Sequence, residues 1–259
     1  METQFKTTSS QSISSPRAKV DRSAEVKNLI QARNAYLLEH EYFRLCRANV
    51  LSREQVVEVV RQLYCFSVFF ERLLARRIAE YSTTMDARVI TMARDHMREE
   101  IGHAQMFADT LRANGVSAAE IDKLEPAMFT KALFGYLTVT IQHENEFVTN
   151  VAIMQVMESI GYHFFSATLG VMRTHGMLAD AMVQHSEDDE HHSELGLDLI
   201  AELDARTMRD CKRVIEDIYR LMSFVLSEWL GVQPYAHPLP PPPRRRRSSR
   251  PPARIVGLS

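Results

Sequence analysis

Metal-binding side chains recur at helical spacing in the segment His185-Ser-Glu-Asp-Asp-Glu-His-His192. At 100° per residue of an α-helix, His185, Asp189 and His192 project from one face. The flanking residues on that face are apolar, among them Met182 and Leu199. Two imidazoles and a carboxylate directed into an apolar core are costly without partners, and a transition metal is a partner that satisfies all three.

A second set with the same chemistry is Glu100-Ile-Gly-His103. Glu-x-x-His places a carboxylate beside an imidazole, as in the di-iron bundles. Such pairs are also common on solvated helix faces, so the motif alone is weak. Burial strengthens it, because Glu100 falls within an apolar stripe that includes Ile90 and Met97, whereas Glu99 points toward solvent.

A third acidic residue, Glu158, lies at the centre of the apolar stripe that runs from Val151 to Met172. Taken alone, this carboxylate is equally well explained as a metal ligand or as the partner of a buried base.

Together, the inward-facing residues supply three carboxylates and three imidazoles, which is enough for two metals with positions left open for oxygen and substrate. The mixed nitrogen and oxygen donors suit iron or manganese better than magnesium. The alternative is a buried polar network that only specifies packing. The predicted ligands are Glu100, His103, Glu158, His185, Asp189 and His192.

Other polar residues near these motifs have weaker claims. Asp188 and His191 point away from the inward direction, which favours solvent or outer-layer roles. Glu144 lies on the apolar side of its stretch and is the candidate for a contact with a ligand or with the substrate, and Glu71 is a weaker one. Two histidines show no inward phase and are predicted at the surface: His96 and His143.

Helical patterns position all of these residues, and the chain is predicted to be all-α, with one helical domain over residues 23–231. The start and stop signals include the capping box of Ser52 and Gln55, the cap Ser117, and the terminators Asn114-Gly115 and His175-Gly176. The predicted helices are 24–47, 52–81, 86–113, 118–123, 126–174 (bent near 146), 178–203 and 205–230. Residues 1–22 and the Pro/Arg-rich segment 232–259 are predicted to be disordered tails.

Composition narrows the class of protein. Residues 1–231 carry 25 lysines and arginines against 33 acids, and an acidic body is a poor binder of nucleic acid. The three cysteines are scattered and fit reduced thiols. No apolar run approaches the length of a membrane span, and no signal-peptide core is present, so a cytoplasmic protein without membrane partners is expected.

The order of the motifs resembles the haem-oxygenase-like di-metal oxidases and oxygenases: Glu-x-x-His, one Glu about 55 residues later, then His-x-x-x-Asp-x-x-His. The opening segment from Glu39 to Phe70 resembles the first helices of that superfamily. The resemblance covers roughly residues 25–230 and implies a single haem-oxygenase-like bundle of about seven helices. It also implies two Fe(II) per chain (manganese being the alternative), O₂ as co-substrate and no haem, with the six residues above as ligands.

Members of that superfamily include a fatty-acid decarboxylase, amino-acid C–C lyases and N-oxygenases. The expected function is N-oxygenation of a small amino acid or amine-bearing metabolite in specialised metabolism. Oxidative C–C cleavage or decarboxylation of an amino or fatty acid by the same site is the alternative, and a metal-storage protein without catalysis is the alternative from another class. The expected partners are a small-molecule substrate, an external electron donor and a second copy in a homodimer.

True haem oxygenase is a further rival, since His40 in the first helix could serve as an axial ligand. The Gly-rich distal helix that haem needs is not seen in the sequence. The thiaminase-like branch uses a nucleophilic cysteine, and none here lies in a matching motif. Ferritin-like storage is disfavoured because His-x-x-x-Asp-x-x-His does not match the ferritin carboxylate motifs.

Overall fold

The computed structural model of the chain describes residues 22–81, 86–192, 195–201 and 203–232, and for residues 187–191 it describes the backbone only. Within these ranges the chain is helical and contains no strand, which confirms the all-α prediction. The predicted disordered tails, 1–22 and 232–259, lie outside the described residues apart from Arg22 and Val232. The helices are α1 Arg22–Leu37, α2 Glu41–Ala48, α3 Arg53–Tyr81, α4 Ala87–Glu100, α5 His103–Ala113, α6 Ala118–Ile121, α7 Met128–His143, α8 Glu146–Asn150, the π-helix η1 Val151–Met157, α9 Glu158–Thr174, α10 Asp180–His192, α11 Leu197–Ile200 and α12 Ala205–Trp229.

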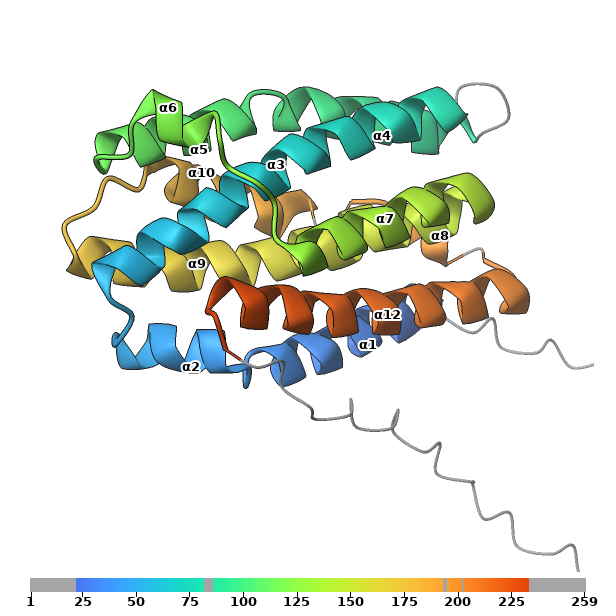
Figure 1. Ribbon diagram of the computed structural model, residues 1–259. Coiled ribbons are helices and arrows are strands. Elements are labelled where there is room, and N and C mark those ends of the chain that lie inside the picture. The colour runs from blue at the N-terminus through green and yellow to red at the C-terminus, as the bar shows by residue number, and fades with distance from the viewer. Residues whose placement is uncertain (1–21, 82–85, 193–194, 202, 233–259) are drawn as a thin grey trace, which may run out of the picture.

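The helices form a layered bundle (Figure 1). The long helix α3 crosses the molecule between α4 and α5 on one side and α7 and α9 on the other, and α12 runs beside α1 and α7 on the opposite face. The interior is a continuous apolar core to which most helices contribute. No helix in the described part of the chain combines the length and apolar character that a membrane crossing requires.

Several helix ends follow the sequence signals. Ser52 and Gln55 form the expected capping box, with the Gln55 amide nitrogen donating to the Ser52 hydroxyl at 3.2 Å and the Ser52 amide donating to the Gln55 side chain at 2.9 Å. Ser117 caps α6 in the same way. Gly115 and Gly176 adopt positive φ angles of 96° and 61° directly after helix ends, as a C-terminal glycine does.

Four of the predicted helices are interrupted in the structure: 24–47, 86–113, 126–174 and 178–203. The first break occurs where His40 caps α2 by accepting the Tyr42 amide at 3.1 Å. The last follows α10, where Gly196 has φ 80° and a Cβ there would lie 2.8 Å from the Asn150 side-chain nitrogen. A side chain would be strained at this φ and would press on the Asn150 side chain, so glycine suits the turn that brings the chain against α8.

The predicted bend near residue 146 is a complete break, because Glu144 ends α7 in extended backbone and Asn145 caps α8. The chain then passes through η1, in which all seven residues are buried, before α9 begins at Glu158. Short π segments inside α-helices occur frequently at functional sites. This one lies directly before a predicted metal ligand.

Candidate metal centre

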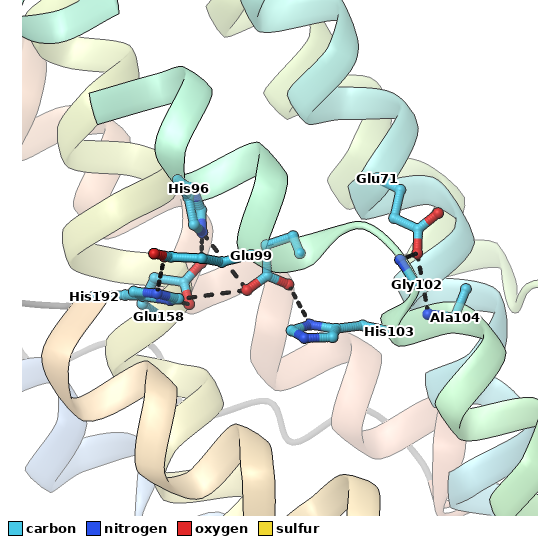
Figure 2. A network of polar contacts seen from close by, with 9 residues as sticks. Glu71, His96, Glu99, Gly102, His103, Ala104, Glu158 and His192 are labelled. Carbon is cyan, nitrogen blue, oxygen red and sulfur yellow. Dashed lines mark hydrogen bonds and ion pairs between the residues drawn. The ribbon is translucent and has the colours of Figure 1, made fainter. Parts of the chain in front are cut away.

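Two helices and the start of a third bring four buried donors together at the middle of the bundle (Figure 2). His96 and Glu100 come from α4, Glu158 from the first residue of α9, and His192 from the end of α10. Each of these residues is at most 4% exposed. One ligand atom from each lies within 4.8 Å of the others, so the four residues form a group able to hold a metal ion.

The spacing of these donors fits an ion better than it fits hydrogen bonds. Two donors that each lie about 2.1 Å from one ion are roughly 3.0–4.2 Å apart. His96 Nε2 lies 3.1 Å from Glu158 Oε1, and His192 Nδ1 lies 3.5 Å from Glu158 Oε2. Glu100 Oε1 lies 3.8 Å from both nitrogens. Glu100 Oε1 is buried and accepts no hydrogen bond from any described residue, which a bound cation would compensate.

A second group adjoins the first and consists of Glu100, His103 and His185, all buried. Here Glu100 uses its other oxygen, because Oε2 lies 2.8 Å from His103 Nδ1. The two oxygens of one carboxylate therefore face two neighbouring donor groups. Glu100 would therefore be able to serve as a ligand in both groups, so the residues fit the predicted pair of metals with mixed nitrogen and oxygen ligands.

The spacing of the Glu-x-x-His motif predicts that both residues lie on one helix, but in the structure they lie on two. The helix ends at Glu100, Gly102 follows with φ 102°, and α5 begins at His103. Glu71 of α3 accepts hydrogen bonds from the Gly102 and Ala104 amides at 3.1 Å each, as Figure 2 shows. Glu71, which the sequence made a weak candidate, thus fixes the start of the helix that carries His103.

Aromatic rings fix the orientation of His185. Its ring stacks on Phe165 at 4.4 Å between centroids and on Phe107 at 5.0 Å, and it meets the His103 ring edge-on at 4.1 Å. Burial, together with neighbouring His103, lowers the pKa of His185 to about 3. The imidazole is therefore neutral at pH 7, which is the form that binds metals.

His192, in contrast to His185, carries a positive charge in the metal-free protein at pH 7. Burial lowers its pKa, but Glu158, Glu100 and Glu99 together raise it to about 9. Burial likewise raises the pKa of Glu158, but His96 and His192 lower it to about 2. At neutral pH the metal-free centre therefore holds an imidazolium paired with a carboxylate.

Metal binding is consequently expected to release a proton and to weaken as the pH falls. The His192 proton must leave before Nδ1 can bind a cation, so below about pH 9 each unit of pH should cost about tenfold in apparent affinity for this group. Competition titrations with Fe(II) or Mn(II) at pH 6.5 and 7.5 would measure the change. A His143→Ala variant, which removes an exposed histidine, should show the same dependence. Equal affinities at the two pH values would contradict the assignment.

Glu99 lies beside the centre without being among its buried donors. It is 57% exposed, as its predicted solvent direction requires, and it accepts from His192 Nε2 at 2.8 Å. This leaves Nδ1 directed at Glu100 and Glu158. A carboxylate on the far nitrogen of a metal-binding histidine orients the ring and makes it a better ligand.

Asp189, the sixth predicted ligand, lies in α10 between His185 and His192. Its side chain, like those of Asp188 and His191, is outside the described residues.

Glu144 does not join the centre. It pairs with Arg213 of α12, and it belongs to neither donor group. Glu144 does not share a helix with Glu158, because α7 ends at His143, and a contact with the substrate stays a prediction. His40, the rival axial residue, uses Nδ1 to cap α2, and its Nε2 lies 3.0 Å from the Ser227 hydroxyl.

The position of His96 contradicts its sequence-based prediction. It was predicted at the surface, yet it is 1% exposed, whereas His143 is exposed as predicted. The signal that could have found it is its position four residues before Glu100, which puts both on one helix face.

An apolar cavity ends at the centre. Its polar lining residues are Glu100, Glu158, His185 and Ser67. The rest of the wall is apolar or aromatic: Leu63, Phe66, Phe70, Phe107, Met157, Ile160, Gly161, Phe164, Phe165, Met222 and Trp229. Such a cavity suits a largely apolar molecule with one polar end at the metals.

A separate groove, open to solvent, runs along α4 and reaches His96 of the first donor group. His96 and Glu99 line it together with Asp95, Arg88 and Leu195. The groove gives ions and protons an approach to the first donor group that does not pass through the apolar cavity.

Comparisons with known proteins agree with this architecture. A domain of unknown function with a haem-oxygenase-like fold from Shewanella denitrificans matches with a TM-score of 0.69 and 15% identity, covering 83% of this chain and 94% of that one. A TenA family transcription regulator from Silicibacter matches with a TM-score of 0.64 and 15% identity, covering 80% and 95%. A TenA homologue from Pseudomonas syringae matches with a TM-score of 0.63 and 14% identity, covering 81% and 92%.

At such identities these likenesses establish the haem-oxygenase-like fold and nothing finer. No curated protein matches the sequence. The sequence model of the iron-containing redox enzymes, in contrast, matches residues 57–224, which include both donor groups and more than half of the chain. The chain therefore belongs to the family of iron-containing redox enzymes with the haem-oxygenase-like fold.

Proposed function

We propose that this protein is a non-haem di-iron oxidase that uses O₂ to cleave a C–C bond of a fatty acid, with loss of CO₂. The observation that carries the proposal is the pair of donor groups that share Glu100 at the end of an apolar cavity. When bound, two ferrous ions supply the reducing power with which O₂ is activated.

The chain's own residues have three tasks in this scheme. Glu100 holds the two donor groups together through its two oxygens. The stacked rings of Phe107 and Phe165 fix His185 between the centre and the cavity. The apolar wall keeps bulk water away from the reacting atoms.

The cavity wall supports the choice of substrate class. No lysine or arginine lines it, so a carboxylate that enters would be neutralised only at the ions. The remaining wall accepts a hydrocarbon chain against residues such as Phe66, Phe164 and Trp229. A small amino acid would bring a second charge into these apolar surroundings, at a cost of several kcal/mol. The wall therefore supports the fatty-acid alternative over N-oxygenation of a small amino acid.

The electron balance requires a reductant. Conversion of a saturated fatty acid into CO₂ and a terminal alkene removes two electrons from the substrate, whereas reduction of O₂ to two waters consumes four. An external electron donor supplies the other two.

We expect the protein, loaded anaerobically with Fe(II), to consume O₂ in the presence of medium-chain fatty acids and ascorbate. Gas chromatography with mass spectrometry should detect CO₂ and a product one carbon shorter, and a Glu100→Gln variant should form neither. Parallel incubations under ¹⁸O₂ with hydrophobic amines and amino acids test the N-oxygenase alternative. Label on nitrogen would replace the proposal, and bound iron without any substrate-dependent O₂ consumption would favour storage.

A further inference from the structure

Ser67 on α3 is a buried serine whose hydroxyl is unlike those of the other buried residues in the described part of the chain. Its side chain is 6% exposed and lines the apolar cavity. A buried serine in a helix usually bonds the carbonyl four residues earlier, which here belongs to Leu63. Ser67 makes no such bond and no other side-chain hydrogen bond among the described residues.

The other buried hydroxyls all have hydrogen-bond partners. Thr110 and Thr140 donate to the carbonyls of Met106 and Tyr136. The remaining ones are bonded as well: Thr130 to Trp229, Thr149 to Asn145 and Tyr81, Thr168 to Phe164 and Tyr42, and Ser227 to Ser223 and His40. The unused hydroxyl is therefore the one that faces the cavity, where an occupant can supply its partner.

The position of Ser67 sets it apart from the reacting end of the cavity. The metal ligands that line the wall come from α4, α9 and α10, whereas Ser67 comes from α3. Phe70 lies one helical turn farther along α3, about 5 Å, and its ring contacts His96 at 6.0 Å between centroids. Ser67 thus lies about one helical turn along α3 from the ring that contacts His96, on a helix that contributes no residue to the two described donor groups.

We propose that Ser67 is a specificity-determining residue that hydrogen-bonds a polar group on the chain of the substrate. This inference rests on the proposed function. The preferred substrate is then an oxygenated acyl chain, with its carboxylate at the centre and a hydroxyl or carbonyl oxygen at Ser67. A plain hydrocarbon chain would leave the buried hydroxyl without a partner, which disfavours binding.

The chain contains a single tryptophan, and Trp229 lines the cavity, so its fluorescence reports occupancy without any turnover. The experiment titrates the Fe(II)-loaded protein, kept free of O₂, with dodecanoic acid and with a series of hydroxydodecanoic acids that differ in the position of the hydroxyl. We expect one position to bind about 3–10-fold more tightly than dodecanoic acid, the range of one net hydrogen bond.

Substitutions assign that preference to the Ser67 hydroxyl. Ser67→Ala should abolish it, and Ser67→Thr should retain it. Thr140→Ala is the matched control, because it removes a buried hydroxyl that is bonded within its own helix and does not line the cavity. This variant should behave as the wild type.

The two failures are distinguishable. If the acids change the Trp229 fluorescence but no hydroxyl position binds more tightly, or if Ser67→Ala keeps the preference, the role of Ser67 is overturned and the proposed function stands. If no acid changes the fluorescence at all, the fatty-acid function is overturned, and the inference with it.

Discussion

A Glu100→Ala variant is expected to lose both metals, so that the iron bound after reconstitution falls from about two per chain to near zero. The reason is that Glu100 is the residue common to both donor groups, with one oxygen directed at each. Removing it leaves the second group without a carboxylate and the first group with Glu158 alone, so neither group fully offsets the charge of a divalent ion. Iron analysis after desalting measures the content, and circular dichroism checks that the helices persist.

Two neighbouring substitutions serve as controls. Glu99→Ala removes an adjacent but exposed carboxylate that contacts His192, so it should keep two metals at saturation and lower one affinity by roughly 10–100-fold. His96→Ala disturbs the first group and leaves Glu100, His103 and His185 intact, so one tightly bound metal should remain. Two metals in the Glu100→Ala protein would refute the shared carboxylate.

Removal of the metals is expected to lower the melting temperature by roughly 10–20 °C. The metal-free core buries two carboxylates and four imidazoles with incomplete hydrogen bonding, and the ions compensate them. With free metal at about 100 times Kd, each site adds about 2.7 kcal/mol to the free energy of unfolding, and each kcal/mol shifts a domain of this size by roughly 2–4 °C.

Anaerobic calorimetry with and without Fe(II) measures this shift. The Glu100→Ala protein, which lacks the shared carboxylate, should melt at nearly the same temperature under both conditions. A wild-type protein whose melting does not respond to metal would show that the buried donors are satisfied by one another.

The sequence predicts the fold class well, because the helix caps are local. Ser52 with Gln55 and Ser117 with Glu120 act over three residues, and the structure shows both boxes. Helical phase also works for inward residues that lie among apolar neighbours. Glu158 is buried at the predicted position, although the path leading to it is not a regular helix.

His96 was missed because α4 offers two apolar stripes that differ by one residue. The predicted stripe used Ile90 and Met97, whereas the structure buries Val89 and His96 with Ala93 and Glu100. Both stripes contain Ala93 and Glu100, so helical periodicity alone does not decide between them. Tertiary packing decides, through the close approach of Glu158 and His192.

The break at Gly102 was missed for a related reason. A single glycine within a strongly periodic segment is tolerated in a helix, so the pattern favoured one helix across 86–113. The interaction that stabilises the break comes from Glu71, about 30 residues earlier in the chain, which caps α5 from α3. Local sequence carries no trace of that contact.

The number of residues in the π-helix η1 sets the direction in which Glu158 points. A π turn holds one more residue than an α turn, and that residue rotates everything after it by about 100° relative to what precedes it. Deletion of one residue between Val151 and Met157 would let the segment relax into a plain α-helix. The side chains of Asn150, before the segment, and Glu158, after it, could then no longer both point in their present directions. Insertions and deletions in this apolar stretch are thus a means of switching the metal site off, or of building a different one, while the bundle around it keeps its shape.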